Sequence, residues 1–298
     1  MISSHVSTKM GALFRFRNVD KETGAETADS GWHSNMILDA ASSIMQTGFS
    51  ELPIPQLGSS IVEASPDQRG VQSVIPTLNI LRNKVLWEGR FTRASANKAV
   101  MSWGHQYTYR NNASSASSVS EVGIENFNRA VFKDENGIVR SWSISPTENL
   151  IVDMEFMITF TTPTNAIEVR VVDNEGTETS KINVTLTVAP QIDDGAAQWW
   201  KLLSPATQPV TMVIDPNFNG TVKPAQNTMV PANISSEFVY VDRDIMVDIQ
   251  HRAPTGGQQV KGILLKFGCL APSFGILFST PIHIGSGYTF KAESIISW

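Results

Sequence analysis

Two acidic residues in one long, β-prone segment are the first candidates for chemistry. Asp153 and Glu155 are spaced by two within LIVDMEFMITF. In an extended chain, that spacing places both carboxyl groups on one face. Most glycosidases use a pair of carboxyl groups, one as general acid and the other as nucleophile or base. Charged residues also protect the edges of sheets, which is the commoner role, so the pair alone does not predict an enzyme.

A second acidic cluster lies in VYVDRDIMVDIQ. Strand alternation puts Asp242, Asp244 and Asp248 on one face. Such a face could bind Ca²⁺ if loops supplied further oxygen ligands. The alternative, which the pattern favours, is a solvated face opposite Val241 and Val247.

Other groups that could carry catalysis or bind a metal are scattered. The five histidines are isolated, and none has the i, i+4 spacing of a helical zinc site. Zinc needs several nitrogen or sulfur ligands, and the single cysteine, Cys269, lies in KFGCLAP, an apolar context that favours a buried, inert thiol. No nucleophile-elbow or phosphate-binding glycine motif occurs. The sequence therefore predicts a protein that is not an enzyme, with no catalytic residue, metal or other cofactor.

The composition argues against several further classes. The 298 residues carry a net charge of −5, which gives no basic footprint for nucleic acid. No apolar run of about 18 residues occurs, so we expect no membrane span. The first residues, MISSHVSTKMGALF, lack the basic and apolar regions of a secretory signal. One cysteine cannot form an intrachain disulfide, so stability is expected from packing and from association with other chains.

Aromatic residues are the best indication of a binding surface. Tyr107, Tyr109, Trp199 and Trp200 are the candidate interface residues, because Trp and Tyr are favoured both as interface anchors and as sugar-stacking platforms. Adjacent tryptophans in a strand cannot both face one core, so at least one of Trp199 and Trp200 should contact another subunit or domain. Trp87 and Trp103 are at least as well explained as residues that fill the cores of sheets.

The pattern of the chain predicts an all-β, β-sandwich-like protein of two lobes. Alternating or β-branched segments bounded by turn residues predict strands; in the first half these are 9–20, 83–92, 100–110, 127–133, 138–144 and 150–160. Gly137 ends the predicted turn DENG and is free to take a positive φ. Further strands, including 167–172 and 182–188, follow a boundary near residue 163. We therefore predict a β-rich domain over 1–163 and a β-sandwich-like domain over 164–298.

One short amphipathic helix is predicted over residues 35–47. Ser34 is a suitable N-cap, and Gly48 is a suitable stop. Between them, apolar residues repeat at helical spacing. A single helix in this place would pack on a sheet or close one end of the sandwich.

Three segments together resemble a recurrent kind of tailed-bacteriophage virion protein. WHSNMILDA, at 32–40, resembles the family's helix start, which has an aromatic residue, an Asn, two hydrophobic residues and an Asp. EVGIENFNRAVFKDENGIVRSWSISPTENLIVDMEFMITF, at 121–160, resembles its central segment, and SIISW, at 294–298, resembles its closing strand. The segments cover under half of the chain. Between residues 52 and 72 the sequence lacks the denser Gly/Thr/Pro run of the family.

The resemblance implies a non-enzymatic structural subunit of a phage particle, made in the host cytoplasm and placed in the tail, baseplate or collar-fibre region. Its partners would be other virion proteins and copies of itself, with a trimer as the first expectation. One alternative is a host-receptor or carbohydrate-binding module that uses exposed Trp and Tyr. Another is a capsid decoration protein. A polysaccharide depolymerase is the least favoured.

Overall fold

The computed structural model describes the chain except for residues 1, 42, 45–48, 96, 162–166, 174, 185, 192–210, 215–229, 232–236, 242–243, 253–254, 268–269, 287–288 and 298. The regular secondary structure of the described residues is almost entirely β-strand, so the predicted all-β class is confirmed. The strands are β1 (Ile2–Asp20), β2 (Glu26–Asp29), β3 (His33–Ile37), β4 (Gln56–Gly58), β5 (Leu78–Ser95), β6 (Lys98–Asn111), β7 (Ser117–Val119), β8 (Glu121–Ile124), β9 (Asn128–Val131), β10 (Trp142–Ile144), β11 (Glu148–Thr161), β12 (Ile167–Val172), β13 (Glu178–Val184), β14 (Leu186–Gln191), β15 (Thr211–Ile214), β16 (Val230–Pro231), β17 (Glu237–Val241), β18 (Asp244–Arg252), β19 (Gln258–Phe267), β20 (Leu270–Ile284) and β21 (Thr289–Ser297).

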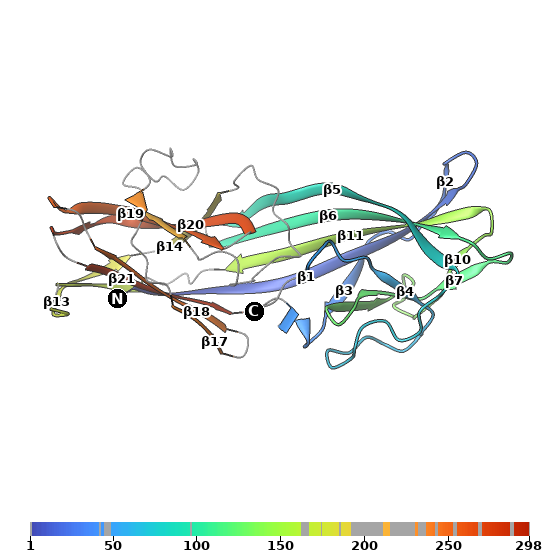
Figure 1. The fold of residues 1–298 in the computed structure, drawn as a ribbon, viewed down its shortest axis with the longest axis horizontal. Helices are drawn as coiled ribbons and strands as arrows, with labels where there is room; N and C mark the ends of the chain where they lie inside the picture. Colours follow the sequence, from blue (N-terminus) through green and yellow to red (C-terminus); the bar gives the residue numbers. More distant parts are fainter. Residues whose placement is uncertain are drawn as a thin grey trace.

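Four long strands run along the molecule as an antiparallel ribbon in the order β5, β6, β11, β1 (Figure 1). The register of β1 against β11 is unbroken from Ser7↔Thr161 to Asp20↔Glu148. Each of the four contains a strand predicted from the sequence and extends it. Alternation in these segments therefore predicted the main elements of the fold.

The described strands form three sheets. The largest has fourteen strands and includes the path β17-β18-β21-β12-β1-β3-β9-β8-β4, with the ribbon attached through β1. A five-stranded sheet has the order β14-β20-β19-β15-β16, and β10 pairs with β7 alone. Strand β1 joins the two halves of the chain, because it pairs with β11 and also, in parallel, with β21 over Ile2–Ser7. The two-domain division near residue 163 stays a prediction.

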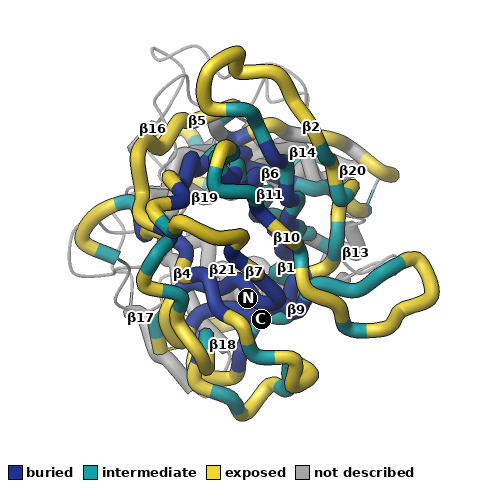
Figure 2. The backbone as a smooth tube through the Cα atoms, turned by 90° about the vertical axis from the view of Figure 1, so that its right-hand side faces the viewer, coloured by how far each residue is buried: buried dark blue, intermediate teal, exposed yellow. Residues whose placement is uncertain are grey.

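The described core is built from aromatic and aliphatic side chains that face inward from the ribbon. Its largest fully buried members include Phe14, Phe16, Trp103 and Phe156. The Phe14 and Phe16 rings lie 5.0 Å apart, centroid to centroid. Figure 2 shows buried backbone surrounded by exposed loops. Of the two tryptophans that a core role explains at least as well as an interface role, Trp103 is buried and Trp87 is half-buried.

The predicted helix over 35–47 is wrong at its start. His33–Ile37 is strand β3, which pairs with β1 through Ala12↔Asn35 and with β9 through Met36↔Arg129. Only Ala41, Ser43 and Ile44 of the described residues are helical, and residues 42 and 45–48 lie outside the description. The backbone of β3 pairs with β1 on one side and with β9 on the other. The local sequence does not show these partners, so its helical spacing of apolar residues predicts the wrong element.

The turn Asp134–Gly137 is confirmed, but its flanking strands are shorter than predicted. Gly137 has a φ of 76°, and its N–H donates to the Asp134 carbonyl at 2.9 Å. Strand β9 covers only Asn128–Val131, and β10 pairs with β7 rather than returning along β9. The predicted strand 182–188 is likewise shared between β13 and β14, which belong to different sheets.

In the described part of the chain, no helix combines the length and apolar character that a membrane span requires.

Candidate functional site

Among the strand residues whose burial the structure describes, the longest run of exposed residues is the β5 edge, which we define as residues Asn79–Leu86. All eight residues are exposed, although they lie in the ribbon that forms the core. Four are large and apolar: Ile80, Leu81, Val85 and Leu86. Strand β5 pairs only with β6, so among the described strands its other edge has no partner. An exposed, long, apolar edge is a template for pairing with another chain.

Two irregularities shape the β5 edge. The register against β6 shifts between Ile80 and Arg82 and again between Val85 and Trp87, which leaves Leu81 and Leu86 without a partner on β6. Bulges of this kind re-aim side chains and are common at sheet edges. Charge on the edge is of one sign, because Arg82 and Lys84 are its only charged residues and both are exposed. The edge therefore combines apolar contacts with positive charge.

Trp87 fixes the strand that carries this edge. Its indole Nε1 donates to the Ser102 hydroxyl at 3.2 Å, and the Arg90 guanidinium lies 4.3 Å from the ring centroid. The ring packs directly on Gly104 of β6, where an added Cβ would come within 2.5 Å of indole atoms. The edge is thus presented by a strand that is held firmly to β6.

A buried ion pair lies between β8 and β9. Glu121 and Arg129 are fully buried, and Arg129 Nε donates to Glu121 Oε2 at 2.8 Å. The hairpin register pairs Gly123 with Arg129 and Glu121 with Val131, which makes the two charges diagonal neighbours on one face. An isolated charge would be very costly here, so the rest of the network must satisfy both groups.

The network is completed by the backbone of residues 59–73, which we call the 59–73 loop. The Glu121 carboxylate accepts hydrogen bonds from the backbone N–H groups of Ser73 at 2.9 Å and Gln72 at 3.1 Å. Arg129 donates to the carbonyl oxygens of Val62 at 2.9 Å and Glu63 at 3.2 Å. The ion pair therefore serves as an anchor for a segment that has no described strand of its own.

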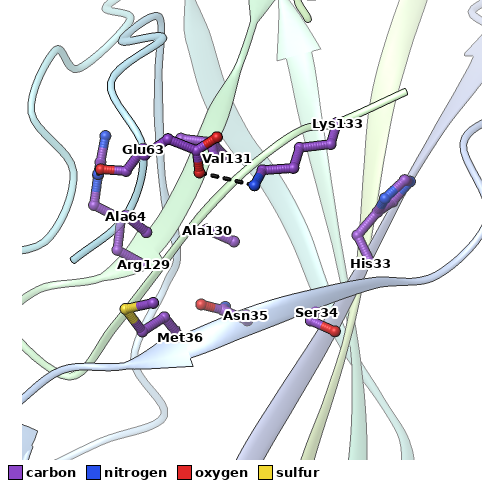
Figure 3. Close-up of a pocket in the computed structure, with 10 residues that line it drawn as sticks. All are labelled: His33, Ser34, Asn35, Met36, Glu63, Ala64, Arg129, Ala130, Val131 and Lys133. Carbon is purple, nitrogen blue, oxygen red and sulfur yellow. Dashed lines mark hydrogen bonds and ion pairs between the residues drawn. The ribbon is translucent and has the colours of Figure 1, made fainter. Parts of the chain in front are cut away.

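A pocket of about 420 Å³ opens beside this anchor, between β3, β9 and the 59–73 loop (Figure 3). Its lining comprises His33, Ser34, Asn35, Met36, Glu63, Ala64, Arg129, Ala130, Val131 and Lys133. Lys133 Nζ and Glu63 Oε2 form an ion pair of 2.8 Å, and both side chains are exposed. Asn35 is buried, and neither its Nδ2 nor its Oδ1 has a hydrogen-bond partner among the residues that the structure describes.

The structure places the predicted interface tyrosines in the interior, which corrects their expected exposure. Tyr107 and Tyr109 are buried in the chain's own core, and burial raises the pKa of both phenols. Their hydroxyls donate to the carbonyl oxygens of Pro53, at 3.1 Å, and Pro55. These contacts attach the 51–58 segment to β6. Trp199 and Trp200 lie outside the described residues.

The acidic candidates do not form a common site in the described residues. Asp153 is buried and accepts hydrogen bonds from Arg17 at 2.7 and 3.1 Å and from Gln106 at 2.9 Å, while Glu155 is half-buried. Asp244 and Asp248 belong to β18, and Asp242 is not described. No group of three or more His, Cys, Asp or Glu residues suited to a metal ion occurs in the parts of the chain that were described.

Sequence reasoning missed Glu121, Arg129 and Asn35 as functional candidates. A signal existed for the first two, because EVGI and NRAV each place one charge in a short apolar strand. If ENFN forms the end of a hairpin, its two strands place Glu121 and Arg129 next to each other. Asn35 carries no such signal, because the sequence predicts a helix for its segment.

No family model matches this chain, and no curated protein or solved structure matches it.

Proposed function

We propose that this chain is a non-enzymatic structural subunit that assembles with copies of itself through the β5 edge. The observation that carries the proposal is the run of eight exposed residues on a strand whose outer edge pairs with no other described strand. Association would supply the missing hydrogen-bond partners of the strand and bury its apolar side chains.

Charge favours a second copy as the occupant. The strand segment 78–95 holds four basic residues and one acidic residue, whereas the whole chain carries −5. The remainder of the chain is therefore more acidic than the whole, so another copy can supply the complementary charge. A two-fold contact of β5 with β5 would bring Arg82 and Lys84 of two copies together, which is unfavourable.

The charge distribution therefore favours a head-to-tail contact, in which the basic edge meets a different, acidic surface of the next copy. Contacts of this type close into rings when the rotation between copies allows it. A trimer is the smallest such ring and agrees with the expected stoichiometry.

We further propose that the assembly belongs to a tailed-phage particle, in the tail, baseplate or collar-fibre region. The support for this step is the resemblance of residues 32–40, 121–160 and 294–298 to such virion proteins. The buried pair Glu121–Arg129 lies inside the central resembling segment, and its hydrogen bonds to the chain's own backbone support a structural role for that segment.

The oligomer is tested by light scattering coupled to size-exclusion chromatography on the full chain. We expect the wild type to elute as an oligomer and Leu81→Lys to lower its mass toward that of one chain. Ile138→Lys is the matched control, because Ile138 is 51% exposed, like Leu81 at 50%, but lies in the turn after β9. A monomeric wild type, or equal loss of mass in both variants, would contradict the proposed edge.

The particle assignment is tested by immunogold labelling of intact phage particles with an antibody raised against this chain. Label at the tail tip, baseplate or neck is the expected result. Label spread over heads would replace the proposal with capsid decoration, and absence of label from all particles would remove the virion assignment.

A further inference from the structure

The ribbon has a second edge that pairs with no further described strand, and β2 forms it. Strand β2 covers Glu26–Asp29 and pairs only with β1 among the described strands. Three of its four residues are exposed. With β2 included, the order across this end of the ribbon is β5, β6, β11, β1, β2 (Figure 1). The basic β5 edge therefore lies on one side of the ribbon, and β2 lies on the other.

The two edges lie at the same height along the ribbon. Lateral rows of paired residues cross the sheet through one residue each of β6, β11 and β1. The row that starts at Arg82 ends on Asp29, and the row that starts at Ile80 ends on Ala28. Each of the four steps between strands is antiparallel, so β5 and β2 run in the same direction.

This geometry allows the sheet to continue from one copy to the next. The β5 edge of a second copy can be placed beside β2 without any shift along the strands, and the two strands would then pair in parallel. Adding a strand to an exposed edge gives main-chain hydrogen bonds to both partners. Repeated head-to-tail contacts close into a ring when the rotation between copies allows it, whereas a shift along the axis at each step gives an open helix.

The charge of the β2 side is opposite to that of the β5 edge. Strand β2 contains two carboxylates and no basic residue, whereas the β5 edge contains two basic residues and no carboxylate. Arg15 and Arg17 pair with the carboxylates of β2, but Arg17 is shared with the buried Asp153. Three carboxylates thus share two guanidinium groups, which leaves this side acidic. Opposite charges favour contact between the two different edges over contact between like edges.

An exposed tryptophan follows β2. Trp32 is 42% exposed, and Gly31 before it has a φ of 70°, a left-handed conformation that glycine adopts readily. The lateral row that starts at Val85 ends on His33, the neighbour of Trp32. In a continued sheet, Trp32 would therefore lie at the height of apolar residues of the β5 edge. Tryptophan is enriched among the residues that contribute most to binding at interfaces.

We propose that the β2 edge, which we define as residues Glu26–Trp32, receives the β5 edge of the next copy, so that one sheet runs around the ring. The inference rests on the assembly proposed above and supplies the second half of each contact. Arg82 then faces the carboxylates of β2, and Trp32 covers apolar side chains of the β5 edge.

The test is complementation between two variants of the full chain, measured by light scattering coupled to size-exclusion chromatography. Leu81→Lys disrupts the β5 edge and keeps the β2 edge, whereas Trp32→Lys does the reverse. We expect each variant alone to have the mass of one chain. An equal mixture keeps one intact edge of each kind, so it should form a species with twice the mass of one chain and nothing larger.

Ile138→Lys is the matched control for Trp32→Lys, because both substitutions place a lysine at an exposed apolar side chain. It should leave the mass of the wild-type oligomer unchanged. Circular dichroism shows whether Trp32→Lys is folded. If it is not, Glu26→Lys, at a side chain that is 43% exposed, takes its place in the mixture.

The outcomes separate this inference from the assembly on which it rests. If Leu81→Lys is monomeric but the folded β2-edge variant keeps the wild-type mass, the β2 edge is not the receiving surface, while assembly through β5 stands. A mixture of two monomeric variants that stays monomeric has the same meaning. A monomeric wild type, or Leu81→Lys with the wild-type mass, would overturn both proposals.

Discussion

Arginine side chains lie in opposite environments in two regions: buried beside the 59–73 loop and exposed on the β5 edge. Beside the loop, Arg129 is fully buried and bound to Glu121 and to backbone carbonyls. On the edge, Arg82 is exposed and follows the exposed Leu81. The loop uses charge to hold the chain's own backbone, whereas the edge presents charge outward. The same residue type therefore stabilises the fold in one region and is available for recognition in the other.

The largest effect that would sharpen this comparison is expected from Arg129→Met. The substitution leaves Glu121 buried without its cation and removes the donors to the Val62 and Glu63 carbonyls. Breaking a buried pair on one side costs about 3–5 kcal/mol of unfolding free energy. Urea denaturation measures this loss.

Arg82→Met is the matched control on the β5 edge. Its effect should stay within about 0.5 kcal/mol, as is usual for exposed positions. Equal effects of the two substitutions would break the comparison.

The second-largest expected effect is a pH dependence of stability caused by His105, which is buried on β6. Burial lowers the pKa of His105 to about 4 from its ordinary value of 6.5. Between these two values the unfolded chain binds the proton and the folded chain does not. The contribution of the neutral ring is therefore present above pH 6.5 and is lost as the pH falls toward 4.

We expect this residue to account for about 2 kcal/mol of the stability lost between pH 7 and pH 5. Urea denaturation of the wild type and of His105→Gln at both pH values isolates the contribution, because the other titrating groups are common to both. Parallel pH profiles would contradict the assignment.

Tyr107→Phe should have a smaller effect. The substitution keeps the buried ring but leaves the Pro53 carbonyl without its donor at 3.1 Å. The expected cost is about 1 kcal/mol, measured by thermal or urea unfolding. A neutral result would show that the 51–58 segment does not depend on this bond.

The smallest effect is expected from Leu81→Thr on the β5 edge. Leu81 is half exposed and has no partner residue on β6, so the free energy of unfolding of the single chain should change by no more than about 0.5 kcal/mol. Measurement at a concentration where the chain is monomeric separates this value from any effect on assembly. A loss above 1 kcal/mol would show that Leu81 packs within its own chain.

Most of the ribbon could be predicted from the sequence, because alternation in segments such as 9–20 and 150–160 is a local property. The turn at Gly137 was predictable for the same reason. Strand β3 was not, because its backbone partners come from β1 and β9, and the local apolar spacing also fits a helix. The predicted strand 182–188 is divided between β13 and β14, which belong to different sheets. The local alternation of residues does not indicate this division.

The candidate sites were less predictable than the strands. Tyrosine is a residue type that is common in interfaces, which is why Tyr107 and Tyr109 were candidates. Their hydroxyls instead donate to the carbonyl oxygens of Pro53 and Pro55, more than fifty residues away in sequence. The exposure of the β5 edge depends on which strand lies beside it.

The parallel pairing of β1 with β21 also determines the order in which the chain can acquire its structure. Residues 7–20 of β1 gain their β11 partner once residue 161 has been synthesised, but Ile2–Ser7 must wait for residues 292–297. At about 5–20 residues per second, roughly 7–27 s separate the two events on a ribosome. During that interval the first residues of β1 have no parallel partner, so protection of this segment by a chaperone or by the nascent chain itself would favour correct folding.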